Sequence, residues 1–240
     1  MKILLFKDRK YLVRDESKDY HTQFGFLKSA DIKKAKPGEV IKSNTGKSFI
    51  VIDADFIDLY NKIKRQAQII PKKDLGLIIT ETGINKDSIV IESGAGSGAV
   101  GTFLAKICKK VYSYEIREDF YNLVKGNIEF LGIKNMKLKN KDAKLGFDEK
   151  NVDIIILDLP DPWELVEVAK KSLKPGGFLV SYSPTVPQVM DFIEALDKDF
   201  VYLKTCEVIE RQWEVKLRKV RPRSQQIGHS GFLSFIRKIN

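Results

Sequence analysis

Short apolar runs separated by turn residues fill the first part of the chain. Such runs occur at residues 3–6, 11–13, 40–41 and 49–52. Runs this short, interrupted this often, indicate β-strands joined by tight turns. After Asp55 the apolar positions change to a helical period, at Phe56, Leu59, Tyr60 and Ile63. We therefore predict a small N-terminal β module over residues 1–55 and a helical linker over residues 56–74.

From residue 88 onward, apolar runs of strand length alternate with apolar positions at helical spacing. Strands are expected at residues 89–91, 111–114, 136–139, 152–157 and 178–182. Two further strands, at about 201–209 and 232–237, are separated by a polar, basic stretch and not by a helix. Strands that alternate with helices form a parallel sheet, and the last pair supplies one antiparallel partner at its edge. The outline over residues 75–240 resembles the Rossmann-like, seven-stranded α/β sheet of class I methyltransferases.

A glycine-rich segment separates the first of these strands from the helix that follows it. Its residues are Glu92, Ser93, Gly94, Ala95, Gly96, Ser97 and Gly98. Glycines let the backbone turn sharply and let a ligand lie directly against the main chain. Glu115 closes the next strand, where a carboxylate can accept hydrogen bonds from the ribose hydroxyls of a nucleoside cofactor. Because Gly96, Gly98 and Gly101 also fit the dinucleotide pattern, the glycines alone leave NAD and S-adenosylmethionine open.

Two acidic residues favour S-adenosylmethionine. Glu92 directly precedes the loop, where an acid can bind the amino group of the methionine moiety, whereas an anionic pyrophosphate would gain nothing from it. Asp142 follows the third strand, where a carboxylate can accept a hydrogen bond from the exocyclic amine of adenine. A surface Asp in that place is also common as a simple turn residue. The preference for S-adenosylmethionine therefore rests on Glu92 and Asp142 together and not on either acid alone.

The fourth strand ends in Asp158, Leu159, Pro160, Asp161, Pro162 and Trp163. The carboxyl ends of parallel strands line the ligand crevice of an open α/β sheet, so Asp158 should face the methyl group that is transferred. The prolines stiffen this loop. The segment resembles the D/N-P-P-Y/W motif of amino-methylating enzymes but departs from it by carrying Leu159 and Asp161 within the pattern.

Taken together, these segments resemble the tRNA (adenine-58 N1) methyltransferase family of archaea and bacteria. The resemblance covers nearly the whole chain. It rests on the glycine loop, the 158–163 loop and further segments at residues 65–69, 73–74, 113–117, 182–185, 188–189, 221–223 and 228–233. It implies S-adenosylmethionine as methyl donor, tRNA as substrate, Asp158 as the main catalytic residue and a homotetramer. It also implies a cofactor site formed by Gln68, Glu92, Gly94, Gly96, Ser97, Gly98, Glu115, Asp142 and Asp158. The expected product carries a methyl on N1 of adenine 58 in the T-loop, and methylation of adenine 57 stays open.

One departure from the family limits what the resemblance implies. Members often place Tyr or His just before the Pro-Lys-Asp of the linker, whereas this chain has Ile70, Pro71, Lys72, Lys73 and Asp74. A catalytic role of that aromatic or His therefore does not extend to this chain. The alternative activities are methyl transfer to a small molecule, such as a corrinoid precursor, and a non-catalytic RNA-binding role that would need no donor site.

Several residues outside the donor site are candidates for substrate contacts. Tyr182 closes the fifth strand and either flanks the target base as a catalytic residue or belongs to the core. His229 is expected to have a structural role, because N1 of adenine attacks with a lone pair and needs no base. A basic run interleaved with Trp213 is either a solvated loop or an RNA-binding segment that contacts phosphates, and its candidate residues are Arg211, Arg218, Lys219, Arg221 and Arg223.

Composition adds a preference for a polyanionic partner. Lys and Arg number 42 against 32 Asp and Glu, which gives a formal charge of +10. Neither Cys108 nor Cys206 has the spacing of a metal site, so we expect no metal and a reducing compartment. With no long apolar stretch and no signal-like start, the expected location is the cytoplasm, without a membrane segment.

Overall fold

The computed structural model describes residues 1–240 and divides them into two compact units, Met1–Ile63 and Lys64–Asn240. The boundary falls within the segment 56–74 proposed as a helical linker. The helix α2 (Phe56–Tyr60) belongs to the first unit and α3 (Lys72–Thr82) to the second. No helix in either unit is both long and apolar enough to cross a membrane.

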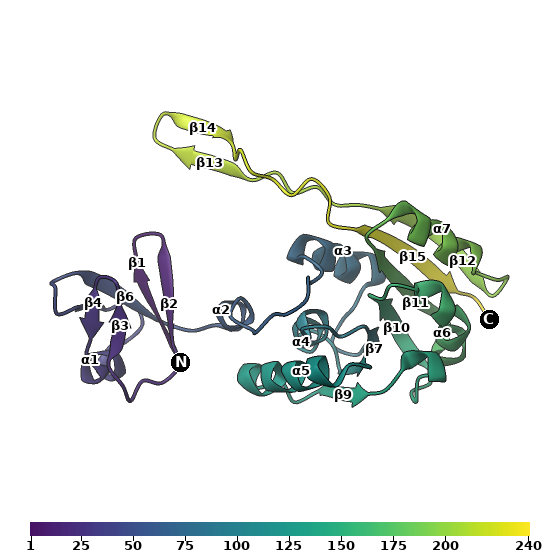
Figure 1. Cartoon of the computed structure of the whole chain (residues 1–240), viewed down its shortest axis with the longest axis horizontal. Helices are drawn as coiled ribbons and strands as arrows, with labels where there is room; N and C mark the ends of the chain where they lie inside the picture. Colours follow the sequence, from purple (N-terminus) through teal and green to yellow (C-terminus); the bar gives the residue numbers. More distant parts are fainter. The chain divides into compact units, whose positions relative to one another are not determined.

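The first unit is a small β module (Figure 1). Its four-stranded antiparallel sheet has the order β2 (Arg9–Val13), β1 (Lys2–Phe6), β6 (Ser48–Asp53) and β5 (Val40–Lys42). A separate hairpin joins β3 (Tyr20–Thr22) and β4 (Gly25–Leu27). The apolar pattern did not predict the short helix α1 (Ser29–Lys34), because Ile32 is its one buried residue and six residues are too few to display a period.

The predicted seven-stranded sheet of the second unit is confirmed. Its strands follow the order β12 (Phe200–Cys206), β15 (Phe232–Lys238), β11 (Leu173–Ser183), β10 (Val152–Leu157), β7 (Ile89–Ser93), β8 (Lys110–Glu115) and β9 (Met136–Asn140). The strands β7 to β11 run parallel, whereas β15 is antiparallel to both of its neighbours. The strand order reverses between β7 and β10, and ligands of open α/β sheets bind at such a switch point.

Helices cover both faces of this sheet. One face packs against η1 (Ala143–Leu145), η2 (Pro162–Leu165), α6 (Val166–Ser172) and α7 (Val186–Glu194). The buried side chains Ile91, Ile155 and Leu179 point to that layer, and their neighbours along each strand point to the other face. The helices α4 (Ala99–Leu104) and α5 (Glu118–Leu131) lie against β8 and β9.

Two segments of the second unit differ from the predicted pattern. The strand β11 begins at Leu173, five residues before the expected strand at residues 178–182. Its register with β10 shifts between Val152 and Ile154, so the extra residues form a bulge. The basic stretch before the last strand forms a hairpin of β13 (Trp213–Lys216) and β14 (Lys219–Pro222), which extends away from the sheet (Figure 1). We refer to residues 213–222 as the basic hairpin.

Candidate active site

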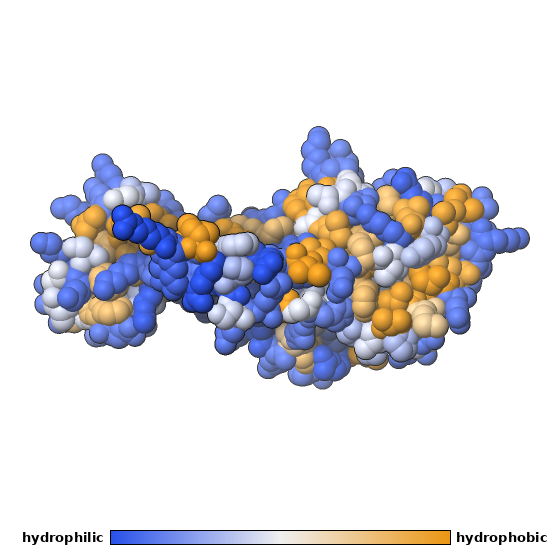
Figure 2. Space-filling view, turned by 90° about the horizontal axis from the view of Figure 1, so that it is seen from above, coloured by the Kyte–Doolittle hydropathy of each residue, from blue (hydrophilic) through white to orange (hydrophobic).

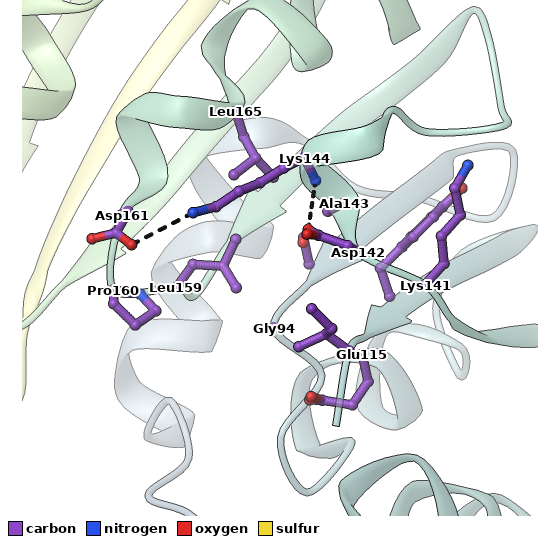
Figure 3. A pocket seen from close by; sticks show the side chains of 13 residues that line it. Gly94, Glu115, Lys141, Asp142, Ala143, Lys144, Leu159, Pro160, Asp161 and Leu165 are labelled. Carbon is purple, nitrogen blue, oxygen red and sulfur yellow. Dashed lines mark hydrogen bonds and ion pairs between the residues drawn. The ribbon is translucent and has the colours of Figure 1, made fainter. Parts of the chain in front are cut away.

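A cavity of about 240 Å³ lies at the carboxyl ends of the central strands. Its walls come from residues that end or follow β7, β8, β9 and β10: Ser93, Gly94, Tyr114, Glu115, Ile116, Lys141, Asp142, Ala143, Lys144, Leu159, Pro160, Asp161 and Leu165. Figure 3 shows most of these side chains around the opening. The cavity combines acidic groups with apolar walls and so can hold a nucleoside with both a polar sugar and a flat base.

The glycine loop approaches its neighbours too closely for other residues. A Cβ on Gly94 would lie 2.0 Å from the Asp158 carbonyl oxygen, and one on Gly98 would lie 2.8 Å from Val124 Cγ1. Gly96 is different, because its φ of 54° is left-handed but no atom lies nearer than 3.8 Å to its Cβ position. Gly94 and Gly98 therefore permit packing of the fold, whereas a Cβ on Gly96 would make only ordinary contacts and is opposed by its left-handed φ.

Glu92 lies beneath the glycine loop. The side chain is 2% exposed, its Oε1 accepts the Gly101 N–H at 3.1 Å and its Oε2 accepts the Ser113 hydroxyl at 2.5 Å. Burial raises the pKa of Glu92 to about 8, against the opposing effect of these two hydrogen bonds. In this structure Glu92 holds the start of α4 to β8, and its contact with the methionine amino group stays a prediction.

Glu115 is placed between the loop and the cavity. Its Oε2 accepts the Gly96 N–H at 2.9 Å and its Oε1 accepts the Arg117 N–H at 3.0 Å. An ionised carboxylate has about four lone-pair sites, so the two hydrogen bonds from Gly96 and Arg117 leave lone pairs of Glu115 free to accept further hydrogen bonds. Glu115 lines the cavity, and its remaining lone pairs fit a pair of ribose hydroxyls.

The other predicted cofactor residues occupy different places around the cavity. Asp142 lines it and caps η1 by accepting the Lys144 N–H at 2.9 Å. Ser97 is 1% exposed, and its hydroxyl accepts the Gln66 N–H at 3.3 Å. Gln68 is exposed and does not line the cavity. The structure therefore brings Asp142 together with Gly94 and Glu115 in the cavity wall and leaves Ser97 and Gln68 outside it.

Asp158 follows β10 at the edge of this site. Its N–H donates to the Ser93 carbonyl at 2.9 Å, which fixes the backbone beside the glycine loop. The carboxylate accepts no hydrogen bond from the chain, and burial raises its pKa to about 7. Gln188 of α7 donates to the Pro160 carbonyl at 2.9 Å and so anchors the same loop. An unpartnered, partly buried carboxylate is costly to a fold and is typical of a group that meets a substrate.

Tyr182 is the penultimate residue of β11, the neighbouring strand. It is 6% exposed, and its hydroxyl donates to the Ser230 carbonyl at 2.6 Å. Burial raises the pKa of Tyr182 to about 12. The ring therefore packs against the start of β15, while its strand position keeps it at the same edge of the sheet as Asp158.

His229 has acceptors at both ring nitrogens. Its Nδ1 lies 2.8 Å from Glu207 Oε2 and its Nε2 lies 3.0 Å from the Pro184 carbonyl. These hydrogen bonds raise the pKa of His229, because both favour the ring with two N–H groups. The contacts agree with a structural role, as the sequence indicated.

The basic residues proposed for RNA contacts lie on or beside the basic hairpin, outside the cavity wall. Arg221 Nε is 3.2 Å and Lys219 Nζ is 3.3 Å from Glu214 Oε2. Arg211 lies over the Trp213 ring, with the guanidinium carbon 5.7 Å from its centroid. Arg218, at a left-handed φ of 59°, makes the turn. These side chains are exposed on an extended element and are accessible to a large partner.

Sequence reasoning missed Lys144 as a residue of the cavity wall. It ion-pairs with Glu164, and its Nζ lies 3.7 Å from Asp161 Oδ2 (Figure 3). These pairs link η1 to the loop after β10 across the cavity wall. A lysine two residues after Asp142 carries no recognisable signal, because its partners are supplied by a segment nearly twenty residues further along.

Comparison with known proteins adds the family context. A family model described as the tRNA methyltransferase complex GCD14 subunit matches residues 58–230. A tRNA (adenine(57)-N(1)/adenine(58)-N(1))-methyltransferase TrmI of Methanocaldococcus jannaschii is 32% identical, over 96% of this chain and 92% of that protein.

Two solved structures match the fold over the whole chain. A tRNA (m1A58) methyltransferase TrmI from Aquifex aeolicus has a TM-score of 0.85 and 27% identity, covering 100% of this chain and 96% of that one. A structure described as a SAM-dependent O-methyltransferase from Thermotoga maritima has a TM-score of 0.91 and 30% identity, covering 100% and 92%. The two descriptions differ in the atom that receives the methyl group.

Proposed function

We infer from its membership of the GCD14 family of tRNA methyltransferases that this chain methylates N1 of adenine 58 in the tRNA T-loop, with S-adenosylmethionine as donor. The reaction and the substrate are inferred from the family match and from whole-chain relatives named as tRNA (adenine-N1)-methyltransferases. A corrinoid-type small-molecule activity is less well supported, because these relatives match both units and not the sheet alone.

The unpartnered Asp158 carboxylate is the observation that carries the mechanism. N1 of adenine has its own lone pair, so the reaction needs orientation and charge stabilisation but no general base. Bound donor supplies an electrophilic methyl on a sulfonium. Asp158 accepts a hydrogen bond from the adenine N6 amine, points N1 toward that methyl and stabilises the positive charge that grows on the ring. The base must leave the folded T-loop to reach this position.

The residues around the cavity fit the donor. Glu115 binds the ribose hydroxyls and Asp142 binds the adenine amine, which is supported by the place of both carboxylates in the cavity wall. Ile116 and Leu159 offer apolar surface to the base. Gly94, Gly96, Gly98 and Ser97 form the loop along the methionine portion, with Glu92 below it. Gln68, which lies outside the cavity wall in the segment before α3, contacts the donor when it binds.

Substrate contacts are assigned to two places. Tyr182, at the strand end beside Asp158, flanks the target base. The RNA backbone is contacted by Arg211, Arg218, Lys219, Arg221 and Arg223. Exposed cations on a projecting element support this assignment, because phosphate contacts position a nucleic acid without reading its sequence.

We further propose a homotetramer located in the cytoplasm, where tRNA is modified. The basic hairpin also exposes apolar side chains, with Leu217 95% and Val215 72% exposed. Apolar side chains reach the surface elsewhere as well, as the face in Figure 2 shows. Exposed apolar residues on a projecting arm favour contact with further copies of the chain.

Nucleoside analysis of treated tRNA tests the proposed function. Incubation of unmodified tRNA with the enzyme and isotopically labelled S-adenosylmethionine is expected to give labelled 1-methyladenosine, found by mass spectrometry. A tRNA with guanine at position 58 should give none, unless adenine 57 is also used. Label in a ribose 2′-O-methyl nucleoside would instead support the oxygen acceptor named for the Thermotoga structure.

A further inference from the structure

A buried ion pair lies in the first turn of α3. Asp74 is fully buried, and Lys73 Nζ lies 2.9 Å from both of its carboxylate oxygens. Lys73 Nζ also donates to the Val208 carbonyl at 2.6 Å and to Ser230 Oγ at 2.6 Å. Removing two charges from water costs energy that an apolar pair of similar volume would not cost. The pair is therefore better suited to fixing a geometry than to adding stability.

This pair links three segments that are far apart in the sequence. Ser230 Oγ accepts from Lys73 and donates to Asp74 Oδ2 at 2.8 Å. Val208 follows β12 and Ser230 precedes β15, so both chain segments that lead to the basic hairpin are tied to α3. The bond between His229 and Glu207 joins the same two segments a second time.

The backbone at Ser230 in turn holds Tyr182. The Ser230 carbonyl accepts the Tyr182 hydroxyl at 2.6 Å. The next residue, Gly231, lies flat on the ring, because a Cβ there would lie 2.4 Å from Tyr182 Cζ. The ring is thus fixed from two directions by residues 230 and 231, and any shift of that backbone would shift the ring.

Tyr182 and Asp158 lie at the carboxyl ends of adjacent strands. Leu157, the last residue of β10, pairs with Ser181 of β11 in parallel register, so the residues that follow this pair are Asp158, just after β10, and Tyr182, the penultimate residue of β11. The negative charges of Asp74 and Asp158 both raise the pKa of Tyr182, which agrees with all three lying near one another.

We propose that Lys73, Asp74 and Ser230 are positioning residues that hold Tyr182 beside Asp158 at the site of the target base. None of the three lines the cavity, so they act through Tyr182 and not on the cofactor. This inference rests on the proposed function, because it presumes that Tyr182 flanks the base that Asp158 orients.

Ser230→Ala tests the link with the smallest change. It removes the hydroxyl between the ion pair and residue 230 but keeps the carbonyl that accepts from Tyr182. We expect kcat for tRNA methylation to fall about tenfold, because small misplacements of positioning groups reduce rates strongly, while KM for tRNA changes less than about twofold. Ser234→Ala is the matched control: Ser234 is also buried on the segment that follows, and its hydroxyl bonds to Thr205 at 2.8 Å. It should retain kcat within about twofold.

A double-mutant cycle separates positioning through Tyr182 from a general loss of stability. If Ser230 acts through the Tyr182 hydroxyl, Tyr182→Phe should lower kcat on its own, and adding Ser230→Ala should lower it little further. Additive effects, an unchanged Tyr182→Phe, or equal effects of Ser230→Ala and Ser234→Ala would overturn the inference. A wild-type enzyme that makes no 1-methyladenosine would instead overturn the proposed function.

Discussion

At the scale of single residues, Asp158 combines features that serve the reaction and oppose the fold. Burial raises its pKa to about 7, and no donor from the chain compensates its charge. Asp158→Ala should therefore lower kcat by about 10²–10³ with little change in KM for tRNA, since the lost interaction strengthens as charge develops on the base. Steady-state kinetics over tRNA concentration measure both constants, with the exposed Asp191→Ala of α7 as control. A rise in KM alone would reassign Asp158 to binding.

The same carboxylate predicts opposite pH dependences for activity and stability. The hydrogen bond from the adenine amine needs the ionised form, so kcat should rise as pH increases through about 7 in the wild type. An acid whose pKa is higher in the folded than in the unfolded state loses stability as pH rises between those two values. Asp158→Asn should consequently raise Tm at pH 8 relative to wild type, and have little effect on Tm near pH 4. Thermal unfolding followed by circular dichroism at both values measures this, and an unchanged Tm at pH 8 would contradict it.

At the scale of elements, Gly96 in the loop between β7 and α4 can be compared with Gly126 in the helix α5. Gly96 has a left-handed φ and only ordinary contacts at its Cβ position, the nearest being Ala67 Cβ at 3.8 Å, whereas Gly126 lies inside α5 with no atom within 4 Å of that position. Gly96→Val should leave a folded protein, destabilised by roughly 1–2 kcal/mol, that no longer binds S-adenosylmethionine in calorimetry. Gly126→Ala should bind normally and unfold at an equal or higher temperature. Undiminished affinity of Gly96→Val would move the donor site away from this loop.

The basic hairpin is the second element that allows a matched comparison. Replacing Arg218, Lys219 and Arg221 by Ala should weaken tRNA binding and flatten its salt dependence, because fewer counterions are released. The control triple, Lys86, Lys109 and Lys134, lies before the amino ends of β7, β8 and β9, at the edge of the sheet opposite the cavity. It removes the same charge and should leave the slope of log Kd against log salt nearer the wild-type value. Equal slopes for both triples would show that net charge, and not this hairpin, attracts the RNA.

At the scale of the whole molecule, the proposed tetramer predicts a mass near four chains in multi-angle light scattering at micromolar concentration. The exposed apolar side chains of the hairpin give a way to disrupt it. Leu217→Glu and Val215→Glu together should lower the mass while the far-ultraviolet circular dichroism spectrum stays unchanged. A wild-type monomer would refute the assembly, and a tetramer unaffected by the two substitutions would place its interfaces elsewhere.

The sequence by itself determined the parts of this protein that depend on local order along the chain. The alternation of buried runs and helical periods predicted the parallel sheet, and parallel strands bring their carboxyl ends to one edge. The loop at Gly94, Glu115 and Asp158 could therefore be assigned to one site from their places at three strand ends. The structure confirms that sheet, and it places all three at that edge.

Only the tertiary structure decided which groups these side chains meet. Glu92 precedes the loop as predicted, yet both of its oxygens are used by Gly101 and by Ser113, 21 residues away. Tyr182 could have been a core residue or a base contact, and its hydroxyl bonds to Ser230 from 48 residues away. Periodicity reports which face of an element is buried but not the donors that another segment supplies there. The same reason applies to Asp158, because only the positions of all neighbouring segments show that its carboxylate has no hydrogen-bond donor from the chain.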